Sequence, residues 1–145
     1  MLSTKKLQKY ILKELKKGPA MSTSILHFCE GQPGSEEGVY VFSKDGRYML
    51  QANEKGTLTD MCETTDKREI LWGVVNNVSI DTMLQYARSH TPTGVDFRRA
   101  MFEKELEIFS AFGADFKQRK EREIAEILER YPYNDNMGQG TDSGV

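Results

Sequence analysis

Residues 38–64, GVYVFSKDGRYMLQANEKGTLTDMCET, decide the fold. Three short runs rich in apolar, aromatic and β-branched residues are separated by two turns, residues 43–46 and 53–56. Asp45-Gly46 is a strong hairpin signal, because the turn needs positive φ at its central residues and glycine accepts it without strain. The stretch predicts a small antiparallel β-meander of three strands, with residues 25–28 as the candidate for a fourth. One face of such a sheet must be covered by helices.

A basic amphipathic helix is predicted upstream of the sheet, over residues 3–17. Leu7, Ile11 and Leu15 recur every four positions, lysines occupy the other faces, and Gly18-Pro19 ends the helix. Two interpretations stay open. The apolar stripe can dock on the core of the domain, which we favour, or the helix can lie on an anionic membrane or a partner.

Four further helices are predicted downstream of the sheet. Asp66 to Glu69 fit a capping box at the start of the first. Asn76-Asn77 and Ser79 are expected to break it, since their side chains compete for backbone hydrogen bonds, and residues 80–88 form the second helix. Residues 91–94, Thr-Pro-Thr-Gly, are a linker.

The last two helices are predicted to form an antiparallel pair packed on the sheet, because Gly113 leaves only a short turn between them. The first, residues 96–112, carries a stripe expected to be buried, formed by Phe97, Met101, Ile108 and Phe112. Asp115 is expected to cap the second, and Pro132 to end it. Its inward positions are expected to be Phe116, Ile124, Ile127, Leu128 and Tyr131.

These elements predict an α+β fold with one domain over residues 1–133 and a disordered tail over residues 134–145. A chain of 145 residues with 38% hydrophobic and 29% charged residues has the composition of one soluble domain. Its apolar runs are too short to span a membrane, and no apolar run follows the first lysines as in a secretory signal. We therefore expect a cytoplasmic protein.

The net charge of −2 conceals a gradient along the chain. Residues 1–20 carry six lysines against Glu14, whereas residues 21–66 carry three basic residues against eight acidic ones. Nucleic-acid binding is disfavoured, because phosphate recognition needs a clustered basic surface and only the N-terminal segment offers one.

No catalytic residue, metal ligand set or cofactor motif is expected. The chain has two histidines, His27 and His90, and two cysteines, Cys29 and Cys62, whose spacing matches no closed zinc motif. Nucleophile elbows, phosphate-binding loops and dinucleotide fingerprints are absent from the sequence.

Charged residues of the last two helices are expected to pair with one another. Their glutamates are interleaved with lysines and arginines, which is typical of solvated, salt-bridged helix faces. Arg98-Arg99 could hold an anion, but pairing with nearby carboxylates is the simpler interpretation.

The second half of the chain resembles a known family. Residues 96–135 read DFRRAMFEKELEIFSAFGADFKQRKEREIAEILERYPYND, and the hairpin GVYVFSKDGRYMLQANEKG and the helix REILWGVV precede them. In this order and spacing, the segments resemble the immunity protein 63 family of bacterial polymorphic toxin systems. The resemblance spans residues 38–135 and leaves the first 37 residues outside it.

The resemblance implies a non-enzymatic protein that binds and neutralises a cognate toxin. Many toxins of such systems are nucleases with basic clefts, so we expect the toxin to face the acidic stretch. The candidate toxin-binding residues are Glu30, Glu36, Glu37, Asp45, Glu54, Asp60 and Glu63. Two alternatives stay open, a ligand- or peptide-binding regulator with a deep apolar pocket and an undetected hydrolase. The acidic residues themselves have a second interpretation, in which they only keep the sheet in solution.

Overall fold

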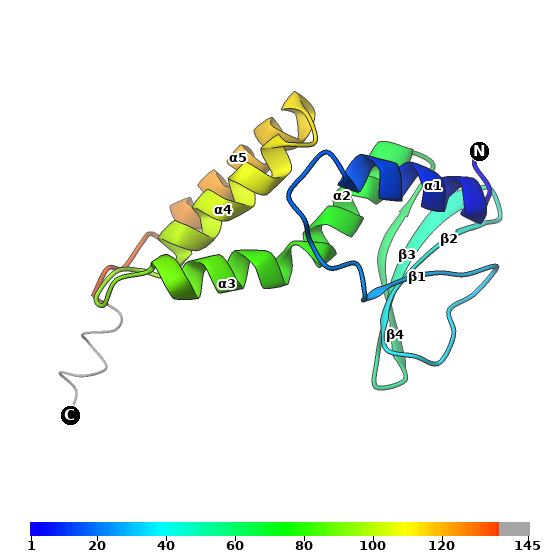
Figure 1. The fold of residues 1–145 in the computed structure, drawn as a ribbon, viewed down its shortest axis with the longest axis horizontal. Coiled ribbons are helices and arrows are strands. Elements are labelled where there is room, and N and C mark those ends of the chain that lie inside the picture. Colours follow the sequence, from blue (N-terminus) through cyan, green and yellow to red (C-terminus); the bar gives the residue numbers. More distant parts are fainter. Residues whose placement is uncertain (137–145) are drawn as a thin grey trace. The chain divides into compact units, whose positions relative to one another are not determined.

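The computed structural model describes residues 1–136 and divides the chain into two compact units, Met1–Val78 and Ser79–Val145 (Figure 1). The first unit contains α1 (Thr4–Leu15), β1 (Leu26–Phe28), β2 (Gly38–Lys44), β3 (Arg47–Glu54), β4 (Thr57–Thr64) and α2 (Lys67–Val78). The second contains α3 (Ile80–His90), α4 (Arg98–Ser110) and α5 (Ala114–Arg130). The predicted α+β class, with a helix, a sheet and then four helices, is confirmed.

Both predicted hairpins are present. The sheet has the order β1-β2-β3-β4, and the β2–β3 and β3–β4 pairs are antiparallel. Lys44 pairs with Arg47 and Glu54 with Thr57, so each turn has two central residues. Asp45 and Gly46 have φ of 51° and 76°, and the second turn has the same signs at Lys55 and Gly56. Positive φ at both central residues suits the right-handed twist of the strands.

The fourth strand joins the sheet, but it runs parallel to its neighbour. Leu26 lies opposite Val39 and Phe28 opposite Val41, and residues 29–37 carry the chain back to the start of β2. A meander would have required a tight turn between these strands. The segment has no such signal and instead forms a loop.

One face of the sheet is covered by α1 and α2. The Cβ position of Gly73 in α2 would lie 2.9 Å from Leu50 Cδ2, which shows how closely this helix packs. In α1, Leu7 and Ile11 are fully buried and Leu15 nearly so. The docking interpretation of the basic helix is therefore confirmed.

Helix boundaries correct two details of the sequence analysis. Asp66 Oδ1 accepts from Arg68 N at 2.8 Å and caps α2 as expected. The helix then continues through Asn77, whose Nδ2 donates to the Gly73 carbonyl at 2.8 Å, and the break comes at Ser79. The side chain of Asn77 bonds within the helix instead of competing with it. At α5 the N-cap is Gly113, not Asp115, which lies in the first turn.

The second unit is built on aromatic packing between α4 and α5, which lie side by side in Figure 1. Phe109 and Phe112 lie with ring centroids 6.3 Å and 6.1 Å from Phe116. Each of these rings is buried. That the pair packs on the sheet stays a prediction, as does the single domain over residues 1–133.

Several apolar positions expected to be buried are exposed. Phe97 is 37% exposed, Ile127 40% and Tyr131 68%, while Met101, Ile124 and Leu128 are half-buried. Helical periodicity identifies the apolar face of a helix, but it does not show how much of that face a neighbour covers. The buried contacts of α5 are concentrated in its first half, at Phe116 and Lys120.

Gly38→Ala tests the parallel pairing of β1 with β2. Gly38 has φ +141°, and an added Cβ would lie 2.6 Å from the Ile25 carbonyl oxygen and 2.7 Å from the His27 ring. We expect the free energy of unfolding to fall by about 3 kcal/mol, because backbone strain and a clash with a fixed carbonyl add together. Urea denaturation followed by the fluorescence of Trp72, which is buried in this unit, measures the change.

Gly56→Ala is the matched control. Gly56 also has positive φ, +84°, but an added Cβ would meet nothing within 4 Å. Its cost should stay at about 1 kcal/mol, from the backbone conformation alone. Equal losses in the two variants would contradict the close approach of the strands.

Candidate partner-binding surface

All seven candidate acidic residues are exposed, and they fall into separate groups. Glu36 and Glu37 immediately precede β2, and Glu54 is the last residue of β3. Gly38 pairs with Asn53, so these three glutamates meet where β2 begins and β3 ends. Lys55 N donates to Glu37 Oε1 at 3.1 Å across this junction. We call Glu36, Glu37 and Glu54 the acidic end of the sheet.

The other candidates lie elsewhere on the first unit. Asp45 is in the β2–β3 turn at the opposite end of the strands, between Lys44 and Arg47, and Glu30 lies in the loop after β1. Asp60 and Glu63 lie on β4, opposite Gln51 and Met49. The structure therefore gathers three of the seven candidates at one end of the sheet.

The backbone that carries the acidic end is held by buried side chains. The Tyr40 hydroxyl donates to the Glu36 carbonyl at 2.7 Å. His27 Nε2 lies 3.1 Å from the Glu37 carbonyl, and since a carbonyl only accepts, Nε2 is the donor. The His27 and Tyr40 rings stack at 4.7 Å. Burial raises the pKa of the Tyr40 hydroxyl.

Asn53 joins the loop to the β3–β4 hairpin. Its side chain is buried, Nδ2 donates to the Gly34 carbonyl at 3.1 Å, and Oδ1 accepts from Gly56 N at 3.0 Å. The acidic end is thus fixed before any partner arrives, which lowers the conformational entropy lost on binding. The sequence analysis missed His27, Tyr40 and Asn53 as positioning residues, because no periodic signal marks side chains that bond to a distant backbone.

Both histidines make hydrogen bonds to other groups of the chain. His27 lies half-buried on β1 and bonds to the Glu37 carbonyl in the loop before β2. His90 Nδ1 lies 2.9 Å from both Ser89 Oγ and the Tyr86 carbonyl. Ser89 Oγ donates to carbonyls of its own helix, so it is not aligned for attack on a substrate.

Among residues 1–136, no three His, Cys, Asp or Glu residues are grouped so that they could hold a metal ion. None of the helices in this part of the chain is long and apolar enough to cross a membrane.

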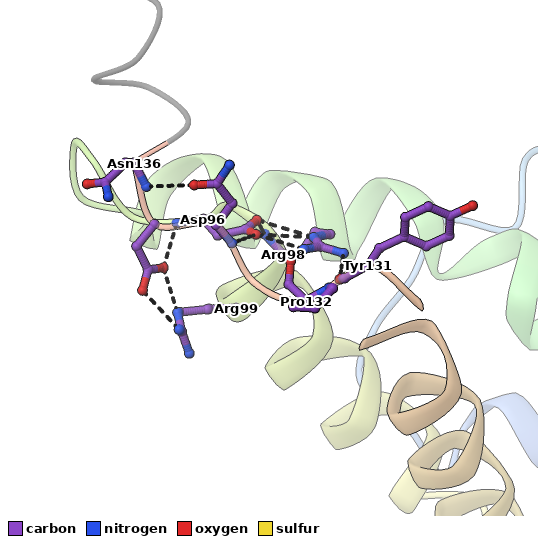
Figure 2. Close-up of polar contacts among 8 residues, drawn as sticks. Asp96, Arg98, Arg99, Tyr131, Pro132 and Asn136 are labelled. Carbon is purple, nitrogen blue, oxygen red and sulfur yellow. Dashed lines mark hydrogen bonds and ion pairs between the residues drawn. The ribbon is translucent and has the colours of Figure 1, made fainter. Parts of the chain in front are cut away.

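Arg98 and Arg99 pair with carboxylates, as the simpler interpretation predicts (Figure 2). Asp96 is 2% exposed, and its Oδ2 lies 2.9 Å from Arg98 Nη2. Arg98 also donates from Nη1 and Nη2 to the carbonyls of Tyr131 and Pro132, each at 2.8 Å. Arg99 Nε donates to Asp135 at 2.7 Å. These guanidinium groups are engaged within the protein, which disfavours a role in holding an external anion.

The cluster fastens the segment after α5 to the start of α4. Asn134 N donates to Asp96 Oδ2 at 2.9 Å, and Asp96 N donates to Asp135 Oδ1 at 3.1 Å. The Tyr133 ring lies 4.1 Å from the Arg99 guanidinium carbon. Residues 134–136 of the predicted tail are thus described and bonded, while residues 137–145 lie outside the described residues. We call this cluster the arginine clamp.

A buried ion pair supports the interior of the second unit. Lys120 is 4% exposed, and its Nζ lies 2.9 Å from Glu123, 3.6 Å from Glu105 and 4.2 Å from the centroid of the Phe109 ring. Burial raises the pKa of Glu105, although Lys120 acts in the opposite direction. The carboxylates of Glu103 and Glu107 instead contact Tyr86 and Lys104. The expected pairing of charges is confirmed for Lys104 with Glu107 and for Lys120 with Glu123 and Glu105. Lys120 is buried, however, and does not lie on a solvated face as expected.

An apolar cavity of about 530 Å³ lies at the end of α1. Apolar side chains and one glycine form most of its wall, and Lys16 and Thr23 supply the polar groups. Its lining is completed by Leu12, Leu15, Gly18, Pro19, Ala20 and Met21. This volume is within the range of small-molecule sites.

The comparison with protein families identifies the class of protein that these features belong to. A model of the family described as immunity protein 63 matches residues 44–126, which is more than half of the chain. The chain belongs to this family, as the resemblance predicts. No curated protein and no solved structure matches it.

Asp96→Asn tests the arginine clamp. The Arg98 guanidinium lowers the pKa of Asp96 to about 2. We expect the variant to lose about 2 kcal/mol of unfolding free energy at neutral pH, because a buried charge-assisted hydrogen bond is weakened. Because the folded-state pKa is depressed, the contribution of Asp96 is complete above its unfolded value near 4 and disappears as the pH falls through about 2. Urea denaturation followed by circular dichroism measures the difference from the parent protein.

Glu121→Gln, at an exposed position of the same unit, is the control and should change the stability by less than about 0.5 kcal/mol. A difference between Asp96→Asn and the parent that is the same at pH 7 and pH 2 would show that ionised Asp96 does not stabilise the fold.

Proposed function

We propose that the chain is a non-enzymatic immunity protein that binds a cognate toxin domain in the cytoplasm of the bacterium that makes both. Membership of the immunity protein 63 family is the observation that carries this proposal. The partner is a protein, with no nucleic acid and no cofactor required. Neutralisation then consists of covering the toxin's working surface for as long as the complex lasts.

The acidic end of the sheet is the surface we propose for the first approach of the toxin. Glu36 is 81% exposed at its side chain, and its Oε2 lies 3.9 Å from Nδ1 of His27. Its charge is therefore available to a basic cleft. Carboxylates that face basic groups speed encounter and exclude wrongly charged partners. The fixed backbone beneath them supports this use, because a rigid charge pattern needs no ordering on contact.

Charge reversal at the acidic end tests this surface. Glu36→Lys together with Glu54→Lys should slow association about tenfold at low salt, with the loss shrinking as salt screens the charges. The measurement is stopped-flow association with the C-terminal domain of the protein encoded immediately upstream.

Asp45→Lys is the control for local charge. Lysine is tolerated in this conformation, since Lys55 has φ 52° at the equivalent turn position and Asp45 has 51°. Asp45 lies the length of a seven-residue strand from the acidic end, about 20 Å, which is beyond the screening length at physiological salt. Association should change by less than about twofold. Slowing by Asp45→Lys that is in proportion to its smaller change in charge, about half the change in free energy of the double variant, would mean that only net charge matters. An upstream domain that neither binds nor is neutralised would end the proposal.

A second candidate function is binding of a small ligand or peptide, and the cavity at the end of α1 favours it. If the cavity is such a site, an uncharged apolar fluorescent probe such as Nile red binds the folded chain, and Met21→Arg, which places a charge in the cavity wall, abolishes the signal. Ser22→Arg, at the neighbouring position that does not line the cavity, should leave the signal unchanged. A probe signal that is indifferent to Met21→Arg would remove this candidate.

A further inference from the structure

β4 forms one edge of the sheet. It pairs with β3 on one side, and no strand within residues 1–136 pairs with its other side. An edge strand offers a row of backbone N–H and C=O groups to any extended segment that comes alongside. β4 has eight residues, whereas the opposite edge, β1, has three. The long edge is the one able to hold a further strand.

The side chains of β4 are open to solvent. All five residues from Thr57 to Met61 are exposed, and two of them are large and apolar: Leu58 is 52% exposed and Met61 47%. Leu50 pairs with Cys62 and Gln51 with Asp60, so Met61 is an extra residue in a β-bulge without a partner on β3. Neighbouring exposed apolar side chains of this size mark an interaction surface.

The charges on β4 disfavour pairing with a second copy. The strand contains no lysine or proline, and its charged residues, Asp60 and Glu63, are both acidic. Two copies paired edge to edge would join strands that carry only acidic charges, and in every register that sets an acid opposite an acid the like charges are destabilising.

The same charges define the segment that fits. Leu58, Asp60 and Glu63 project from one face of β4, because their partners on β3, Asn53, Gln51 and Met49, are two residues apart. A matching strand has an apolar side chain beside Leu58 and basic side chains beside Asp60 and Glu63. Glu63 also lies 3.7 Å from Arg47, whereas Asp60 Oδ1 accepts a hydrogen bond at 2.5 Å from Gln51, a neutral side chain. The charge of Asp60 is therefore the less compensated of the two, which makes Asp60 the stronger determinant.

We propose that an extended, basic segment of the toxin domain adds to β4 as a fifth strand, with its lysine or arginine side chains against Asp60 and Glu63 and an apolar side chain against Leu58. This inference rests on the proposed function and specifies how the partner is held. The acidic end guides the encounter, and the backbone of β4 supplies hydrogen bonds that do not depend on the partner's side chains.

Hydrogen exchange on the complex tests the pairing directly. The full chain is mixed with the C-terminal domain of the protein encoded immediately upstream, and amide exchange is followed in the free and bound states. Strand addition should slow exchange at least tenfold at alternate residues of β4, because their N–H groups become bonded. A stable complex in which β4 exchanges as it does in the free chain would overturn the inference and leave the proposed function intact.

Paired substitutions give an independent measurement. Leu58→Lys together with Asp60→Lys should weaken binding at least tenfold, because an apolar contact is lost and the charge match is reversed. The matched control is Ile127→Lys together with Glu126→Lys, which makes the same chemical change at an exposed apolar and acidic pair on α5. Circular dichroism establishes that both variants fold. Weakening by the α5 pair alone would place the toxin-binding site on α5. Absence of any complex with the parent chain would reject both the proposed function and strand addition to β4.

Discussion

The parallel pairing of β1 with β2 is the constraint on which the proposed surface depends. It forces residues 29–37 to return to the start of β2, and that path brings the carbonyls of Glu36 and Glu37 to Tyr40 and His27. Gly38 makes the return possible, since the Ile25 carbonyl leaves no room for a side chain there. A hairpin at this place would have left the same glutamates on a loose turn.

The sequence contains enough local information to predict the two hairpins and the helix order. Asp45-Gly46 identifies its turn because a two-residue loop requires positive φ, and the four-residue spacing of Leu7, Ile11 and Leu15 identifies the buried face of α1. The direction of β1 was not predictable in this way, because parallel or antiparallel pairing depends on the path of a loop. Exposure of Ile127 on α5 was missed for a related reason, since it depends on which neighbours reach the helix.

The arginine clamp gives a structural reason for the residue types at the two ends of residues 96–135, the stretch that resembles the family. Asp96 and Arg98 begin the stretch, Asp135 ends it, and the structure brings them into one hydrogen-bonded cluster. The residue types allow an anion site at Arg98 and Arg99, although pairing with nearby carboxylates is the simpler interpretation. Only the positions of the Tyr131 and Pro132 carbonyls show that the guanidinium of Arg98 is already occupied.

The way the β1–β2 loop is held also bears on how such a protein can diversify. Tyr40 and His27 bond to main-chain carbonyls, which every amino acid possesses, and the Glu36 side chain approaches this pair only at His27 Nδ1, at 3.9 Å. The residue type at this position can change without altering the bond that fixes it. A lineage can therefore change this exposed position while it inherits the architecture unchanged.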